Sequence, residues 1–181
     1  MDASSILTTL LSSKSVSGIS KAADASSTDV TNILAAAIPS LLKGAQKQTS
    51  GSSAAGFVQA LADHAGANTS NVTSFLKSVD LADGAKIVSH LLTSSETSAI
   101  AKKAGSSAST TKSVLAAAAP LFMSLLGQQT SGSSASAIGS LLSGLAANSN
   151  MTSLLGGLLG GSSGGKTGAA SLASGLMGLL K

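Results

Sequence analysis

Apolar residues recur along the chain at the spacing of one helical face. Val30, Ile33, Leu34 and Ile38 stand at positions i, i+3, i+4 and i+8 of such a face. No stretch of the sequence combines strict apolar–polar alternation with β-branched enrichment, the pattern typical of strands. The pattern therefore predicts an all-α fold. Outside the repeats described next, it places helices at 4–13, 54–65, 134–147 and 168–180.

The helical pattern is repeated within the chain. Residues 19–54 align with residues 100–135 at a constant shift of 81, with 16 of 36 positions identical and no gap. A fainter copy lies between them, because residues 61–76 match residues 19–34 at a shift of 42. Repeats of this length bury their apolar faces by stacking on their neighbours, so we expect pseudo-repeated helical hairpins with a period of about 40 residues in a compact array. The expected copies lie near 19–54, 61–92 and 100–135, within a body at 1–148 that is followed by a Gly/Leu-rich tail at 149–181 with one or two short helices.

Each copy carries the signals of a short helix, a tight turn and a second helix. Gly66 and Gly105 predict left-handed C-caps for the first helix, and Asp24 stands at the equivalent place in the first copy. The Ser, Thr and Asn residues that follow the turn predict N-caps. Pro39 and Pro120 occupy equivalent places inside the long second helices, where the missing backbone N–H predicts a kink or a break.

The composition favours a tightly packed helical core and excludes thiol chemistry. Hydrophobic residues make up 43% of the 181 residues, aromatic residues only 2%, and the chain has no Cys. Helix formers of small and medium size, chiefly Ala and Leu, must therefore fill the core. Disulfides and thiolate metal sites are excluded.

The net charge of +4 is carried by lysine alone, and no acid follows Glu96. The absence of Arg, the side chain best suited to bidentate contacts with phosphate and guanine, argues against nucleic acid as a partner. No uncharged apolar run reaches the roughly 18 residues of a membrane span, and the N-terminus lacks the basic run of an ordinary signal peptide. We therefore expect a cytoplasmic protein, the alternative being an exported or cell-surface protein without an ordinary signal peptide.

One long stretch resembles a known family. The pattern apolar-x-x-x-Ala-Gly-x-Ser, followed by a helix that closes in Leu-Ala-x-x-x-Pro and a Gly/Gln-rich exit, is clearest at residues 86–129. Residues 19–46 echo it, with Asp24 in place of the glycine, and LLGGLLGG at 154–161 has a similar Gly/Leu character. These features resemble the YidB-like bacterial family of unknown function. The resemblance implies a helical bacterial protein with no established activity, so it assigns no catalytic residue.

The remaining motifs do not assemble a catalytic or cofactor site. GGSSGGKT at 160–167 matches the phosphate-binding loop pattern. However, no strand is predicted directly before it, and no apolar strand ending in Asp lies upstream of it. Two S-x-x-K matches, at 40–43 and 74–77, lack the accompanying S-D-N element. The only histidines, His64 and His90, are expected to face solvent or cap helices rather than bind metal. We therefore predict no catalytic, cofactor-binding or metal-binding residue and no enzymatic activity.

The tail carries leucines at helical spacing, which leave three roles open: covering the body's core, self-association, or binding to a membrane surface. The overall prediction is a non-enzymatic helical structural or interaction protein whose partner is itself, as a homo-oligomer or larger assembly. The alternative is nucleic-acid or membrane-surface binding through the hairpins, which look like helix-turn-helix units, and through the C-terminal half, whose only charges are lysines. The candidate self-association residues are Leu154, Leu155, Leu158, Leu159, Leu172, Leu176, Leu179 and Leu180.

Overall fold

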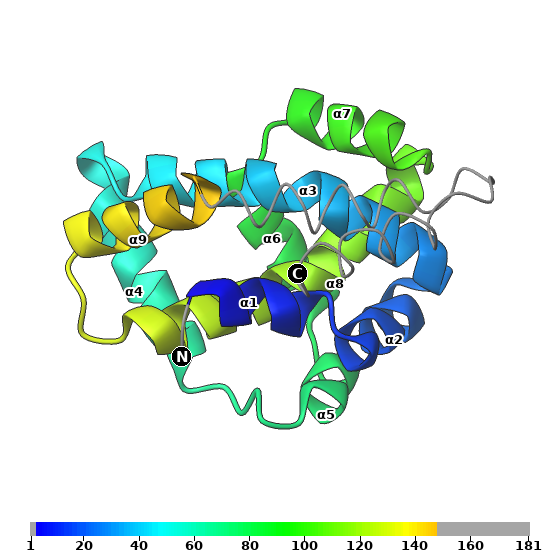
Figure 1. The fold of residues 1–181 in the computed structure, drawn as a ribbon, viewed down its shortest axis with the longest axis horizontal. Coiled ribbons are helices and arrows are strands. Elements are labelled where there is room, and N and C mark those ends of the chain that lie inside the picture. The colour runs from blue at the N-terminus through cyan, green and yellow to red at the C-terminus, as the bar shows by residue number, and fades with distance from the viewer. Residues whose placement is uncertain (1–2, 148–181) are drawn as a thin grey trace, which may run out of the picture.

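The computed structural model describes residues 3–147 of the chain, and side chains within residues 6–146. The predicted helix at 168–180, the phosphate-loop match and the eight candidate leucines of the tail lie outside the described residues. Within them the all-α prediction is confirmed, since the chain forms helices and no strand (Figure 1). The helices are α1 (Ala3–Leu10), α2 (Ser13–Ala23), α3 (Ser27–Gln48), the 3-10 turn η1 (Gly51–Ser53), α4 (Ala54–Ala65), α5 (Val72–Lys77), α6 (Leu81–Leu91), α7 (Ser94–Ala104), α8 (Ala108–Thr130) and α9 (Ala135–Ala147).

Helix α8 forms the centre of the fold. Helices α1, α2, α4, α6 and α7 all pack against it, and every residue from Val114 to Gly127 is buried. By length and hydropathy α8 qualifies as a membrane span, contrary to the expectation that no segment would. Since 83% of its most apolar window is buried within the protein, α8 serves here as a core helix.

The helix bounds match at the shift of 81 residues. Helices α7 and α8 begin 81 positions after α2 and α3, α9 begins 81 after α4, and α6 ends 81 after α1. The two halves interlock, because α3 packs against α7 and α9 of the second half while α8 packs against α2 and α4 of the first. The additional copy at 61–92, and with it the 40-residue period, remains a prediction.

The left-handed turns predicted between the hairpin helices form in two of three cases. Asp24 after α2 and Gly105 after α7 are both left-handed, with φ of 51° and 66°. The next helices are capped by Ser26 and Ser107, whose hydroxyls each accept a hydrogen bond from a backbone N–H at 3.0 Å. The prediction for Gly66 is wrong: its φ is −72°, because the chain leaves α4 through a right-handed turn in which the Ala67 N–H donates to the His64 carbonyl.

Of the kink or break predicted at the two prolines, the break is wrong, and the kink remains a prediction. Both α3 and α8 continue through Pro39 and Pro120. A helical proline leaves the carbonyl four residues earlier without its usual N–H donor, and for Pro120 that carbonyl belongs to Ala116. Gly84 of α6 lies directly against it, since a Cβ added to Gly84 would stand 1.8 Å from the Ala116 oxygen. Tertiary packing thus covers the position that the missing hydrogen bond exposes.

Candidate apolar binding pocket

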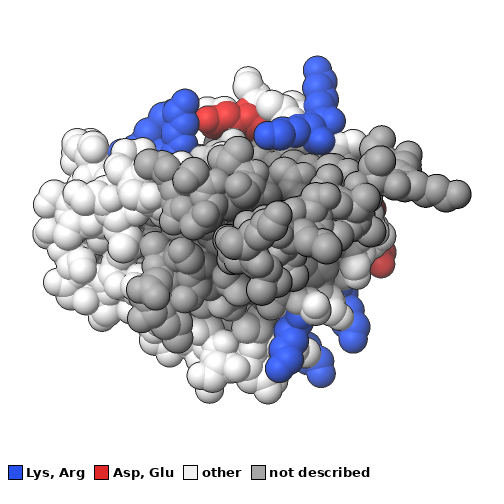
Figure 2. Space-filling view, in the orientation of Figure 1, with Lys and Arg blue, Asp and Glu red and all other residues white. Residues whose placement is uncertain are grey.

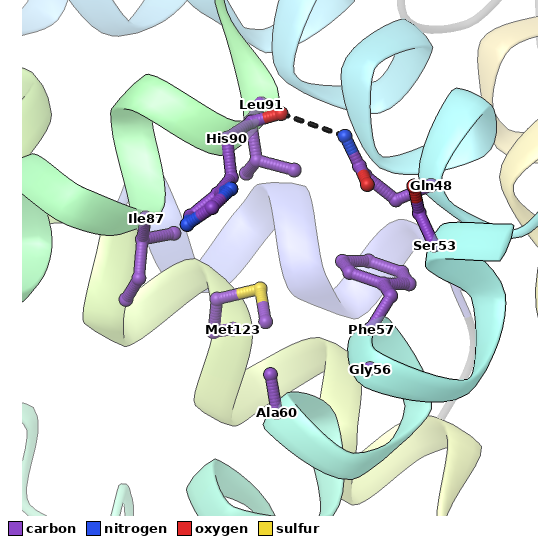
Figure 3. Close-up of a pocket in the computed structure, with 9 residues that line it drawn as sticks. All are labelled: Gln48, Ser53, Gly56, Phe57, Ala60, Ile87, His90, Leu91 and Met123. Atoms are coloured by element: carbon purple, nitrogen blue, oxygen red, sulfur yellow. Dashed lines mark hydrogen bonds between the residues drawn. The ribbon is translucent and has the colours of Figure 1, made fainter.

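An apolar pocket of about 370 Å³ lies between α4 and α6, above α8 (Figure 3). This volume falls in the range of small binding pockets, roughly 300–1,000 Å³. The end of α3 and the η1 turn contribute to its rim. Its lining residues are Gln48, Ser53, Gly56, Phe57, Ala60, Ile87, His90, Leu91 and Met123.

Glycines set the spacing of the helices around this pocket. Gly44 of α3 lies against the Leu91 carbonyl of α6, and Gly127 of α8 lies against the Leu61 carbonyl of α4, with a Cβ at either glycine falling within 2.2 Å of the oxygen. Gly84 brings α6 onto α8 in the same way. Helices α4 and α6 are therefore each held close to a neighbour at a glycine, and the pocket is the space left between them.

The floor and walls of the pocket are apolar. The Met123 side chain lies at the centre of the floor, with Ile87 on one side and Phe57 and Ala60 on the other (Figure 3). Phe57, Leu91 and Met123 are each less than one-tenth exposed. A Met thioether adapts its shape to what packs on it, so the pocket suits an aliphatic side chain or another small apolar group.

Two polar contacts frame the pocket, one at each end. At the first end, Gln48 Nε2 of α3 donates to the His90 carbonyl of α6 at 2.8 Å. At the other end, His64 Nε2 of α4 lies 3.4 Å from Asp83 Oδ2 of α6. His64 Nδ1 is 2.8 Å from the Ala60 carbonyl, which can only accept, so Nδ1 carries a proton.

The histidines therefore act differently. The contact of His64 with the Ala60 carbonyl, in the last turn of α4, agrees with the expected capping role, but the sequence did not predict its approach to Asp83 from another helix. His90 is exposed at the pocket rim. Among the described residues no group of three or more His, Cys, Asp or Glu side chains could hold a metal ion.

Charged side chains gather at the edge where α7 lies on α3 (Figure 2). Glu96 accepts hydrogen bonds from the backbone N–H and the hydroxyl of Thr93, both at 2.8 Å. These bonds, with Lys47 and Lys43 of α3 adding a smaller attraction, hold the pKa of Glu96 below its ordinary value. The carboxylate thus caps α7 and faces the lysines of α3.

The hairpins α2–α3 and α7–α8 are the units that look like DNA-binding motifs in sequence. Thr111 and nearly all later residues of α8 are buried, which leaves mainly Ser109 and Lys112 exposed near its start. Helix α3 begins with exposed Ser27 and Thr28. The exposed starts of these two helices therefore carry few cations that could neutralise the phosphates of a nucleic acid. They do not favour a nucleic-acid interface.

Sequence reasoning did not predict the pocket, although it placed the helices that line it. In the sequence, Phe57, Ile87 and Leu91 are apolar positions of predicted helices, and nothing there distinguishes them from ordinary core residues. What distinguishes them is the spacing of α4 and α6 on α8, which depends on contacts between residues far apart in the chain. The glycines at 44, 84 and 127 were the available signal, because each stands inside a helix where alanine would be favoured.

Comparison with known proteins identifies one family. Its model, described as "Bacterial protein of unknown function (DUF937)", matches residues 5–129. The match runs from α1 into the last turn of α8 and thus includes both long helices and the helices that line the pocket. No curated protein and no solved structure matches the chain significantly.

Proposed function

From the premise that the chain belongs to the bacterial family of unknown function DUF937, with which the YidB-like resemblance is consistent, we propose that it is a non-enzymatic protein that self-associates. Leucines from the tail of one copy, residues 149–181, enter the apolar pocket of a second copy. The observation that carries this proposal is the pocket itself, an apolar concavity floored by Met123, on a chain whose tail holds eight leucines at helical spacing.

The course of α9 favours the pocket of a second copy over the chain's own pocket. Gln46 Nε2 of α3 donates to Ser143 Oγ of α9 at 2.6 Å, while Gly139 lies against Thr49. The two helices are therefore antiparallel, and α9 runs away from the end of α3 where Gln48 forms the pocket rim. Leu154, the first tail leucine, follows Ala147 by only seven positions.

A contact between a tail and a pocket joins two different surfaces. Such a heterologous contact closes into a ring or extends into a filament, depending on the rotation between successive copies. We therefore expect the mass of the assembly to rise with concentration above that of the monomer. Leucine packing against Met, Phe and Ile provides the driving force, at about 25 cal/mol for each Å² of apolar surface buried.

Light scattering over a concentration series of the full-length chain tests the proposal. Gly56→Leu fills the pocket, since a Cβ at Gly56 meets no other atom within 4 Å, and replacing a helical Gly also favours the helix. We expect this variant to weaken association by about tenfold, the effect of losing roughly one well-packed side chain. Gly144→Leu is the matched control, because Gly144 is an exposed glycine of α9 with equally open space, and it should associate normally.

Replacing Leu154, Leu155, Leu158 and Leu159 with Ser in the full chain removes the other half of the contact. This variant should lose association at least as strongly as Gly56→Leu, because it removes four apolar side chains. A wild-type chain that stays monomeric at high concentration would contradict self-association. Loss of association in the Ser variant but not in Gly56→Leu would show that the tail binds elsewhere than the pocket.

A further inference from the structure

A second pocket, separate from the first, lies between α2, α5 and the start of α6. Its volume is about 330 Å³, at the lower end of the range for small-molecule sites. Gly18 allows α2 and α5 to meet here, since a Cβ at Gly18 would stand 2.5 Å from Leu76 Cδ1. The lining residues are Gly18, Lys21, Ala22, Thr73, Leu76, Lys77, Val79 and Leu81.

The inner surface of this pocket is apolar. Leu76 is buried at its base, with 2% of its surface exposed. Leu81 is 39% exposed and is the one large hydrophobic side chain that is exposed among residues 6–146. An exposed leucine alone is common on protein surfaces, but here it lines a concavity that a small apolar chain could fill.

Two lysines stand at the rim, one from each of two helices. Lys21 of α2 and Lys77 of α5 are both exposed, and Figure 2 shows lysine side chains projecting at the edge formed by α2 and α5. Neither lysine lies within ion-pair distance of a described carboxylate. The nearby Asp80 carboxylate is engaged at the start of α6, where it accepts from the Ala82 N–H at 2.8 Å.

We propose that this pocket binds a single-chain anionic amphiphile, such as a medium-chain fatty acid. The hydrocarbon chain lies against Leu76 and Leu81, and the carboxylate lies between the ammonium groups of Lys21 and Lys77. Thr73 adds a hydroxyl that can donate to the same carboxylate. An apolar pocket with a cationic rim fits both ends of such a molecule, whereas a purely apolar ligand leaves the lysines unused. This site is independent of the pocket between α4 and α6.

Isothermal titration calorimetry of the full-length chain with decanoate, kept below its micelle-forming concentration, tests this inference. We expect one decanoate to bind per chain, with decanol, its uncharged counterpart, binding about tenfold more weakly. Lys21→Gln combined with Lys77→Gln should weaken decanoate binding by about tenfold and abolish its salt dependence. Leu81→Ser should weaken decanoate and decanol alike.

Lys103→Gln combined with Lys112→Gln is the matched control, because it removes two other exposed lysines and the same net charge. This variant should bind decanoate as the wild type does. Absence of decanoate binding, equally tight binding of decanol, or equal losses in the two double variants would each overturn the inference. Binding to vesicles of anionic phospholipid without binding to decanoate would also overturn it, in favour of a membrane surface. Gly56→Leu should leave decanoate binding unchanged whether or not the chain self-associates.

Discussion

The long helices α3 and α8 occupy equivalent places in the repeat yet lie in different surroundings. Both begin directly after a Ser cap and contain a proline at the same position. Pro39 of α3 is exposed, whereas Pro120 of α8 is buried. Two copies of one sequence pattern have thus become a half-exposed helix and a central core helix.

The difference follows from where the preceding helices pack. Helix α6, which leads into α7 and α8, lies across α8, and its counterpart α1 also packs against α8. Gly84 permits the close approach of α6, while the first half carries Ala3 at the equivalent position. Helix α8 is therefore covered by helices of both halves, and the repeat does not produce two equal cores.

The largest expected effect comes from removing the glycine that brings α6 onto α8. In Gly84→Ala, the new Cβ would stand 1.8 Å from the Ala116 oxygen, a backbone atom that can move only with α8. We expect the free energy of unfolding to fall by about 3 kcal/mol, at the upper end of the usual cost of overpacking. Urea denaturation followed by circular dichroism measures this change.

Gly144→Ala provides the control for that change. The same substitution in α9 meets no atom within 4 Å, so the higher helix propensity of Ala should stabilise the protein by about 0.5–1 kcal/mol. If Gly84→Ala were as stable as Gly144→Ala, the close contact between α6 and α8 would not be what distinguishes the two long helices.

Parts of this asymmetry were readable from the sequence. At two equivalent positions, α3 has Ser40 and Lys43 where α8 has Leu121 and Ser124. Leu121 and Ser124 are both fully buried, and a helix that is apolar on all sides belongs in a core. Comparing the two copies position by position thus predicts which long helix is central.

Other features depended on contacts that no local pattern encodes. The N-caps at Ser26 and Ser107 and the left-handed turn at Gly105 were predictable, because capping uses neighbouring residues alone. The continuity of α8 through Pro120 was not predictable from local sequence. It depends on Gly84, 36 positions before Pro120, which packs over the free carbonyl of Ala116. The apolar pocket was missed for the same reason, because Phe57 and Ile87 come to line one pocket only through the packing of their helices on α8.

A smaller effect is expected where the copies differ by one hydroxyl group. Val30 of α3 and Thr111 of α8 are equivalent and fully buried, and Thr111 Oγ1 has no hydrogen-bond partner among the described residues. A buried hydroxyl without a partner costs about 1–3 kcal/mol. Thr111→Val should therefore raise the free energy of unfolding by about 1–2 kcal/mol, and the reverse change Val30→Thr should lower it by a similar amount. Chemical denaturation of both variants checks this, and a loss of stability in Thr111→Val would mean that the hydroxyl has a partner in solution.

The smallest expected effect concerns the caps of α2 and α7. Thr93 and Glu96 form a capping box at α7, whereas the equivalent pair at α2, Ser12 and Ser15, contains no carboxylate. Because hydrogen bonds from Thr93 hold the pKa of Glu96 below the ordinary 4.5, the carboxylate stabilises the fold fully above pH 4.5. This contribution is lost as the pH falls below 4.5 through the lowered pKa of the folded protein.

Glu96→Gln should therefore lower the free energy of unfolding at neutral pH by less than about 1 kcal/mol, since the site is largely solvated. The difference from the wild type should shrink as the pH falls below 4.5. Ser15→Ala at α2 should give a difference that does not vary over this range, because Ser15 does not titrate. Denaturation curves at several pH values compare the two variants, and a pH-independent effect of Glu96→Gln would mean that the charge of Glu96 contributes nothing to the cap. The two halves of the repeat would then differ in the shape of their caps and not in their response to acid.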